Sequence, residues 1–196
     1  ARVLAAVEAL GYEVNLTARH LRAGRTDTVA FVVPTFHDYF GELADQVAPL
    51  IEGEGRHLVL ERTSANAQQE MEALSVARLQ IYDGVLLSIA GLDLEHLERV
   101  RPSKPIVLLG ERDVPEHFNH VRLANESGAR LATAHMIERG SRRILALGCS
   151  FDAAHTMATD RRVGWEDACR QAGLAADPAY VVPVSDYTSL GGREAM

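Results

Sequence analysis

The segment Val29-Ala30-Phe31-Val32-Val33-Pro34 decides the fold class of this 196-residue chain. Its apolar residues, mostly β-branched or aromatic, are typical of a short strand, which Pro34 ends because proline has no N–H to donate to a sheet. Apolar runs of similar length recur at 57–60, 84–87, 105–109, 120–123, 143–147 and 180–182. Except at 120–123, which predicts a short edge strand, these runs are continuously apolar after at most one polar first residue, and they predict strands buried on both faces.

Amphipathic segments separate the apolar runs and predict helices over about 40–54, 67–80, 94–100, 126–139 and 160–172. Strands that alternate with helices predict an α/β fold, with a parallel sheet, helices on both faces and right-handed connections. Ligands of such sheets bind beyond the carboxyl ends of the strands. We therefore expect a small molecule at the loops after Val33, Leu60, Leu87, Leu109 and Leu147.

Composition and motifs exclude several classes of protein. With 47% hydrophobic and 24% charged residues the chain is typical of a globular protein, and no apolar run approaches the roughly 18 residues of a membrane span. The two cysteines, Cys149 and Cys169, have neither disulfide nor metal spacing and fit a reducing cytoplasm as buried small hydrophobes. The dinucleotide, P-loop, nucleophile-elbow and HExxH motifs are absent, and the eight histidines are scattered. We expect no enzymatic activity, no cofactor and no metal.

An aromatic cluster follows the first predicted strand, in the loop Thr35-Phe36-His37-Asp38-Tyr39-Phe40. Aromatic rings stack on sugar or base faces, and an adjacent carboxylate accepts hydrogen bonds from hydroxyl or N–H groups. Phe36, Asp38, Tyr39 and Phe40 are therefore candidates for ligand binding. The alternative is that Phe40 holds the following helix to the sheet while Tyr39 lies on the surface.

The start of the chain differs from the rest in charge and pattern. Residues 1–27 carry four arginines against three acidic residues, a balance of +1 within a net charge of −7, which is a weak indication of a nucleic-acid-facing terminus. Helices are predicted over about 2–10 and 16–23, with a linker at 24–27. The chain starts at Ala1 inside a helical pattern and stops as another helix begins, so we interpret it as a fragment cut at both ends.

The helical pattern of Arg2–Tyr12 is followed by Asn15, Ala18-Arg19, Leu21 and Gly24. This stretch resembles the end of the DNA-binding headpiece and the hinge of the lactose-repressor (LacI/GalR) family of bacterial transcription regulators. The resemblance covers the whole chain and continues in family order through Val29–Pro34, Asp38-Tyr39-Phe40, Asp83–Leu87, Pro105–Val107, Asn125–Ile144 and Arg161–Leu174.

The resemblance implies a two-lobed effector domain like a periplasmic sugar-binding protein. Its implied boundaries are 1–14 for the end of the headpiece with the last helix of its helix-turn-helix, 15–27 for the hinge helix and linker, 28–141 for the N-terminal lobe, and 142–196 for an incomplete C-terminal lobe. It also implies a cytoplasmic homodimeric repressor that binds operator DNA and is controlled by a small-molecule effector, a sugar or sugar derivative.

The resemblance further implies roles for single residues. Leu21 would wedge between base steps in the minor groove, with Asn15, Thr17, Ala18 and Arg22 along the groove or phosphates. The alternative is a solvated linker helix with Leu21 packed on the effector domain.

In the effector domain the implied ligand residues are Asn125, Ser127 and Arg161. Arg161 would fork onto vicinal hydroxyls or a carboxylate of the effector. The alternative is an ion pair on the helix surface, with Asp160 or Glu166. The sequence departs from the family at Ala124-Asn125, where the family usually has Asp-Asn, and at Gly140-Ser141, where it has Gly-His.

Two other functions remain open. A solute-binding component of a sugar transport system would have the same fold, and an α/β enzyme would share the alternation of strands and helices. The hinge pattern favours the regulator over the transport component, and the absence of a catalytic constellation argues against the enzyme.

Overall fold

The computed structural model describes residues 24–36, 39–151, 156–184 and 187–196. Within them the chain forms two compact units: the first ends at Leu92 and also includes Arg99–Val107, and the second consists of Asp93–Glu98 and Leu108–Met196. The lobe boundary expected after residue 141 stays a prediction. Outside the described residues lie the helices predicted over 2–10 and 16–23, His37 and Asp38, and the hinge residues Asn15, Thr17, Ala18, Leu21 and Arg22.

A five-stranded sheet has the order β2-β1-β3-β4-β5. β1 lies between β2 and β3 and pairs in parallel with both, which places Phe31 beside Leu60 on one side and Leu86 on the other. Because it has neighbours on both sides, β1 is an interior strand, and it is buried from Val29 to Val33. The strands span Thr28–Val33 (β1), His57–Arg62 (β2), Gly84–Ser88 (β3), Ile106–Leu109 (β4) and Asn119–Val121 (β5).

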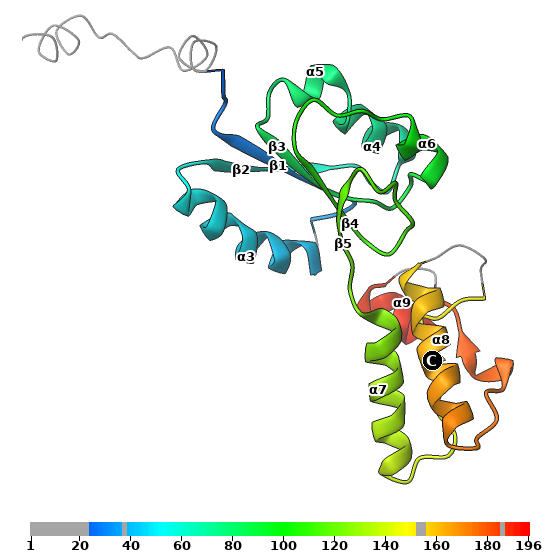
Figure 1. Cartoon of the computed structure of the whole chain (residues 1–196). Helices are drawn as coiled ribbons and strands as arrows, with labels where there is room; N and C mark the ends of the chain where they lie inside the picture. Colours follow the sequence, from blue (N-terminus) through cyan, green and yellow to red (C-terminus); the bar gives the residue numbers. More distant parts are fainter. Residues whose placement is uncertain (1–23, 37–38, 152–155, 185–186) are drawn as a thin grey trace, which may run out of the picture. The chain divides into compact units, whose positions relative to one another are not determined.

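The connections of the first unit reverse direction between β1 and β3. Helix α3 (Tyr39–Gly53) leads outward from β1 to β2, whereas α4 (Ala67–Ala73) and α5 (Val76–Leu79) lead back from β2 past β1 to β3. Right-handed connections that run in opposite directions place α3 on one face of the sheet and α4 and α5 on the other (Figure 1). The predicted parallel α/β fold is confirmed, and the reversal marks the carboxyl ends of β1 and β3 as the ligand edge.

Two expectations for the first unit are wrong. The single helix predicted over 67–80 is interrupted, because Ser75 acts as a new N-cap whose Oγ accepts from the Arg78 N–H at 3.4 Å. Strand β2 was expected to be buried on both faces, but Val59 and Leu60 are 38% and 41% exposed. The reason is its place at the edge of the sheet, where β1 is its one neighbour.

The second unit contains a short parallel pair, β6 with β7. Strand β6 is shorter than the strand predicted over 143–147. Helix α8 starts before residue 160, because Thr156 and Thr159 form a capping box in which the hydroxyl of each accepts a hydrogen bond from the backbone N–H of the other. Besides β5, the elements of the second unit are α6 (Leu94–Glu98), α7 (Asn125–Glu138), β6 (Ala146–Leu147), α8 (Met157–Gln171), a 3-10 turn (Pro178–Tyr180), β7 (Val181–Val182) and α9 (Ser189–Glu194).

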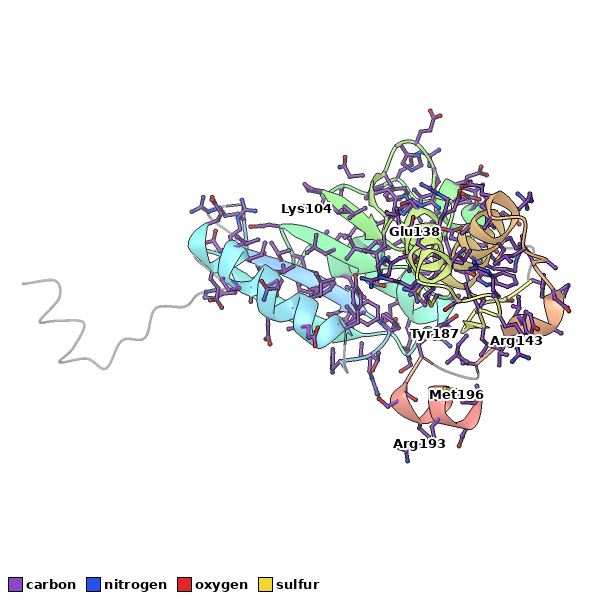
Figure 2. All side chains as sticks on the ribbon, turned by 90° about the horizontal axis from the view of Figure 1, so that it is seen from below. Lys104, Glu138, Arg143, Tyr187, Arg193 and Met196 are labelled. Carbon is purple, nitrogen blue, oxygen red and sulfur yellow. The ribbon has the colours of Figure 1, made fainter. Side chains whose placement is uncertain are left out.

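The loop after β6 is contacted by Tyr187, a residue near the end of the chain. Tyr187, labelled in Figure 2, donates a hydrogen bond from its hydroxyl to the carbonyl oxygen of Gly148 at 3.0 Å. Part of the same ring lies 3.2 Å from where a Cβ of Gly148 would be. The aromatic ring therefore covers the turn that leaves β6.

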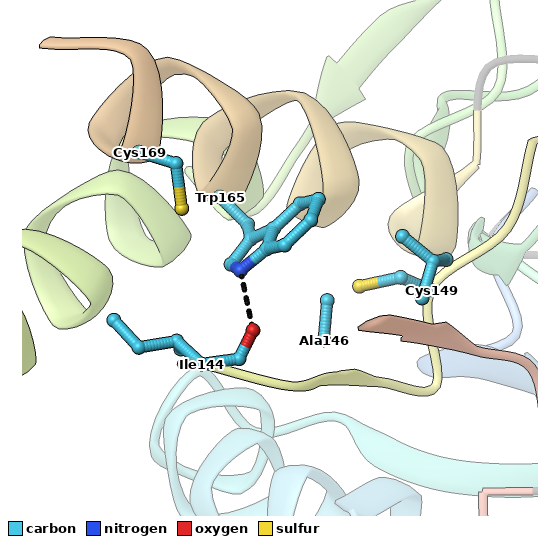
Figure 3. Close-up of a cluster of buried hydrophobic side chains, with 6 residues drawn as sticks. Ile144, Ala146, Cys149, Trp165 and Cys169 are labelled. Atoms are coloured by element: carbon cyan, nitrogen blue, oxygen red, sulfur yellow. Dashed lines mark hydrogen bonds between the residues drawn. The ribbon is translucent and has the colours of Figure 1, made fainter. Parts of the chain in front are cut away.

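Trp165 is the centre of the core of the second unit (Figure 3). Its indole N–H donates to the carbonyl oxygen of Ile144 at 3.1 Å, which satisfies the ring's one polar group inside the core. Cys149 and Cys169 belong to the same cluster and are free thiols, as the sequence predicted. Burial raises the pKa of both thiols, and for Cys149 it outweighs the opposite effect of Arg161 and Arg162.

In the described ranges, none of the helices combines the length and the apolar character that crossing a bilayer requires.

Candidate functional site

Helices α7 and α8 approach each other closely at Gly164. A Cβ built on Gly164 would lie 2.0 Å from the carbonyl oxygen of Glu126 and 2.9 Å from the amide nitrogen of Arg130. Both atoms belong to the backbone of α7, so they cannot move aside as a flexible side chain could. Glycine at this position therefore allows the separation at which the two helices pack.

Arg161 lies one turn before Gly164 and so on the same face of α8. Its Nε donates to Oδ1 of Asn125 at 2.7 Å. Asn125, the first residue of α7, is buried, and its Nδ2 donates to Oε1 of Glu111 at 2.7 Å. The two charged neighbours fix the amide, because its oxygen must face the guanidinium and its nitrogen must face the carboxylate.

Asn125 and Arg161 border an open hollow of about 340 Å³. Four of its lining residues are alanine or glycine, which leave space that larger side chains would fill, and Arg161 and Asn125 supply polar side chains. Among the described residues, Nε of Arg161 has a hydrogen-bond acceptor and Nη1 and Nη2 have none. The lining residues are Leu123, Ala124, Asn125, Gly128, Ala129, Ala132 and Arg161.

The arrangement can bind a ligand that carries several hydroxyl groups. The two Nη atoms of Arg161 are a pair of donors in fixed geometry, and the carboxylate of Glu111 is an acceptor joined to them through Asn125. The volume of the hollow is near the lower end of small-molecule sites, which begin at roughly 300 Å³.

The ion-pair alternative for Arg161 is not what the structure shows in the described residues. Asp160 pairs with Arg122 at 3.4 Å, and Glu166 pairs with Arg162. Arg162 also donates from Nε to the carbonyl oxygen of Ser150 at 2.9 Å, so it holds the loop after β6 and not the hollow.

Ser127 is not brought to this group. It is exposed, its Oγ donates to the carbonyl oxygen of Ala124 at 3.3 Å, and it does not border the hollow. Of the three ligand residues that the resemblance implies in this unit, Asn125 and Arg161 are joined directly and Ser127 lies apart from them.

The aromatic loop of the first unit lies at the ligand edge of its sheet. Phe36 follows the carboxyl end of β1 and is 48% exposed, and Tyr39 at the start of α3 is 50% exposed. The rings of Tyr39 and Phe40 meet edge to face, with centroids 5.1 Å apart. Phe40 is half-buried, so Phe36 and Tyr39 are the rings with a free face. Asp38, the expected carboxylate, lies outside the described residues.

The loop after β3, at the same edge, is held by a buried carboxylate that the sequence analysis missed. Glu70 of α4 is fully buried, and its two oxygens accept from the N–H groups of Ala90, Gly91 and Leu92 at 2.9 to 3.1 Å. A Cβ on Gly91 would lie 2.5 Å from the amide nitrogen of Ala67, so this loop packs directly on the start of α4. Glu70 therefore gives the ligand edge a rigid backbone.

Glu111 is the second residue that the sequence analysis missed. Its signal was its position, because it comes two residues after β4, at the carboxyl end of a strand where ligands are expected. As to metals, the described parts of the chain contain no group of three or more His, Cys, Asp or Glu side chains placed to hold an ion.

A doubly wound parallel sheet with an aromatic loop at its carboxyl edge, and a second α/β unit with a hollow bordered by Arg161, have the architecture of the periplasmic-binding type. Comparison with protein families agrees: the family described as "Periplasmic binding proteins and sugar binding domain of LacI family" matches residues 26–195. The chain therefore belongs to the LacI/GalR family.

Individual relatives agree with the family. The chain is 29% identical over 198 residues to the HTH-type transcriptional regulator AscG of Escherichia coli, covering 98% of this chain and 58% of AscG. It is 30% identical over 198 residues to the HTH-type transcriptional regulator GalS of Salmonella typhimurium, covering 99% and 57%. The chain thus spans little more than half the length of these relatives.

Solved structures show the same fold. A LacI-family structure from Sanguibacter keddieii superposes with a TM-score of 0.77 at 34% identity, covering 87% of this chain and 61% of that one. A complex of the transcriptional regulator CelR with cellobiose gives a TM-score of 0.67 at 25% identity, covering 98% and 58%.

Proposed function

We propose that this chain is the effector-binding part of a DNA-binding transcriptional regulator, a repressor controlled by a sugar or sugar derivative. The observation that carries the proposal is the Arg161–Asn125–Glu111 network beside the hollow, in a chain of the LacI family. The matched relatives AscG and GalS are transcriptional regulators, which supports regulation over both transport and catalysis.

For the second unit we propose that Arg161 binds vicinal hydroxyls of the effector through Nη1 and Nη2. Asn125 orients the guanidinium, and Glu111 supplies the carboxylate that Ala124 lacks where the family usually has aspartate. Ser127, in the first turn of α7, contacts the effector only after its hydroxyl breaks its hydrogen bond to the Ala124 carbonyl oxygen.

For the first unit we propose that the exposed rings of Phe36 and Tyr39 stack on the apolar face of the effector. Phe40 supports Tyr39 through their edge-to-face contact, and Asp38 accepts from effector hydroxyls. The hydrogen bonds from Gly91 and Leu92 to the Glu70 carboxylate fix the backbone of the loop after β3 beside the ligand.

DNA binding is proposed for the segment up to residue 27 and for a helix-turn-helix headpiece, with residues 1–14 as the end of the headpiece and 15–27 as hinge and linker. Leu21 wedges into the minor groove, and Asn15, Thr17, Ala18 and Arg22 contact the groove or phosphates. The effector acts by shifting the population between conformers of different operator affinity. Such a regulator works in the cytoplasm.

A homodimer is proposed from the uncovered edge of the first unit. Strand β2 is the outer strand of the sheet, and it and the helix packed on it, α3, carry exposed apolar side chains at Val59, Leu60 and Leu50. An open edge with apolar side chains is a surface that a second copy can cover. Val59→Glu is expected to shift the protein from dimer to monomer in analytical ultracentrifugation, and an unchanged dimer would place the interface elsewhere.

The experiment that tests regulation uses the full-length protein and a pool of random DNA duplexes. We expect the protein to enrich one duplex sequence, and one member of a panel of mono- and disaccharides to change its affinity for that duplex. A protein that enriches no duplex contradicts the DNA-binding role. A protein that binds a sugar and enriches no duplex is the result a transport component would give.

A further inference from the structure

The carboxylate of Asp83 joins three chain segments at the amino ends of β1, β3 and β4. Asp83 directly precedes β3, and its Oδ1 accepts from the N–H of Thr26 at 2.9 Å and its Oδ2 from the N–H of Asp27 at 3.0 Å. The hydroxyl of Thr26 adds a third bond, at 3.3 Å to Oδ1. Lys104, which comes shortly before β4 and is labelled in Figure 2, places its Nζ 3.9 Å from Oδ1.

The surroundings of Asp83 favour its charged form. Its side chain is 10% exposed, and burial by itself would raise the pKa. The hydrogen bonds from Thr26 and Asp27, together with the charge of Lys104, outweigh burial and hold the pKa of Asp83 below its ordinary value. The bonds to Thr26 and Asp27 are therefore charge-assisted, the stronger kind of hydrogen bond.

Thr26 and Asp27 lie before the sheet and not in it. The β1 ladder begins at Thr28 opposite His57 and at Val29 opposite Gly84, so residues 29–32 are held by both neighbouring strands. Asp27 has a φ of 51°, which marks a turn at the entry to β1, and its carboxylate pairs with Arg25 at 3.0 Å. The carbonyl oxygen of Asp27 accepts from the N–H of His57 at 2.7 Å, and the N–H groups of Thr26 and Asp27 are bound by the Asp83 carboxylate. Asp83 therefore supplies the side-chain part of the linker's attachment to the domain and holds both of these N–H groups.

We propose that Asp83 is the positioning residue that fixes the linker at Thr26–Asp27 to the effector-domain sheet. Its role is to keep the DNA-binding segment attached at a rigid point. This inference rests on the proposed DNA-binding function. A conformational change in the effector domain reaches the DNA-binding segment through linker residues that move with the domain. A flexible linker at Thr26–Asp27 would weaken this coupling between effector binding and DNA binding. Lys104 supports Asp83 and does not itself touch the linker in the contacts described.

The test compares Asp83→Asn with the matched control Glu72→Gln in the full-length protein. Both remove one negative charge from the same unit, and Glu72 is exposed on α4. An asparagine turns an NH₂ group toward one of the two linker N–H groups, so hydrogen exchange at Thr26 and Asp27 is expected to quicken by about ten-fold or more, the factor that corresponds to about 1.4 kcal/mol. Exchange within residues 29–32 is expected to be unchanged.

The same variants are measured against the duplex that the wild-type protein enriches from a random pool. Asp83→Asn is expected to bind it about ten-fold more weakly, and Glu72→Gln like wild type. Lys104→Gln, which leaves all three bonds to Asp83 in place, is expected to give a smaller effect in the same direction and tests the anchor if Asp83→Asn does not fold.

Unchanged exchange at Thr26 and Asp27 would overturn the anchor. Faster exchange with unchanged duplex affinity would overturn its role in DNA binding. A wild-type protein that enriches no duplex contradicts the proposed function itself, which separates that failure from a failure of the anchor.

Discussion

The Nε atom of Arg161 donates a 2.7 Å hydrogen bond to Oδ1 of Asn125 across the crossing of two helices. Gly164, one turn further along α8, makes this bond possible because it lets the α8 backbone reach the backbone of α7 at Glu126. The spacing of arginine and glycine in Arg161–Gly164 is thus explained by geometry: one residue sets the distance between the helices, and the other uses that distance to reach Asn125.

Gly164→Ala is therefore expected to destabilise the protein, because the new Cβ would lie 2.0 Å from a backbone oxygen and the helices must separate. We expect a loss of about 1–3 kcal/mol or more in the free energy of unfolding, measured by urea denaturation. The matched control is Gly128→Ala in α7, where a Cβ meets nothing within 4 Å and alanine favours the helix. Equal stability of Gly164→Ala and wild type would contradict the close approach.

Glu70→Gln tests the hydrogen bonds by which the buried Glu70 carboxylate binds the backbone of the loop after β3. In glutamine one carboxylate oxygen is replaced by an NH₂ group, which donates and cannot accept. At least one of the three backbone N–H groups bound by Glu70 is then left without a good acceptor. The expected loss is about 1–3 kcal/mol in the free energy of unfolding. Urea denaturation beside Glu72→Gln, an exposed charge on the same helix, measures it, and coincident curves for the two variants would show that these hydrogen bonds contribute nothing.

Asp83→Asn is expected to change the pH dependence of stability. The native pKa of Asp83 is below its ordinary value, so the group contributes stability that is complete above the unfolded pKa of about 3.9. That stability is lost as the pH falls through the lower native pKa. The difference in unfolding free energy between wild type and variant should therefore be constant from pH 7 to about 5 and shrink below about 3.9. A difference that grows toward low pH would contradict the lowered pKa.

Tyr82 provides a spectroscopic prediction. Burial, and then the hydrogen bond its hydroxyl donates to Glu61, raise the pKa of Tyr82 to about 12. An ultraviolet absorbance titration of the native protein should show one phenol, absent from Tyr82→Phe, that ionises later than an ordinary tyrosine. The neutral phenol contributes stability below pH 10 that is lost as the pH rises toward 12. Ionisation of Tyr82 near pH 10 would contradict the contact.

Much of the fold could be predicted because it depends on apolar runs. Strands β1 and β3 and helices α3 and α7 lie within a residue or two of their predicted bounds. The wrong predictions concern features that the periodicity of apolar residues does not show. Ser75 interrupts a continuous helical pattern with a side-chain cap, and β2 is exposed because of its place in the strand order, which its own residues do not encode.

The candidate site was less predictable, because its contacts join residues far apart in the chain. Asn125 and Arg161 were identified through the family resemblance, and the structure joins them. Glu111 lies in the loop after β4, and no motif or periodic pattern marks it as a site residue. Glu70 has the sequence position of an ordinary solvent-exposed acid in the first turn of a helix. Only the close packing of the β3 loop on α4 shows that Glu70 is buried.

The central claim is that Arg161 binds the effector, and calorimetric titration of the full-length protein tests it most directly. The probe is the mono- or disaccharide from a panel that binds wild type most tightly. Arg161→Ala is expected to weaken binding about ten-fold or more, because at least one charge-assisted hydrogen bond is lost, and Arg161→Lys to restore it only in part, because an ammonium lacks the planar fork. The control, Arg170→Ala, removes an exposed arginine of the same helix that pairs with Asp167 and should leave binding unchanged. Binding by Arg161→Ala within about two-fold of wild type, less than about 0.5 kcal/mol, would contradict the assignment.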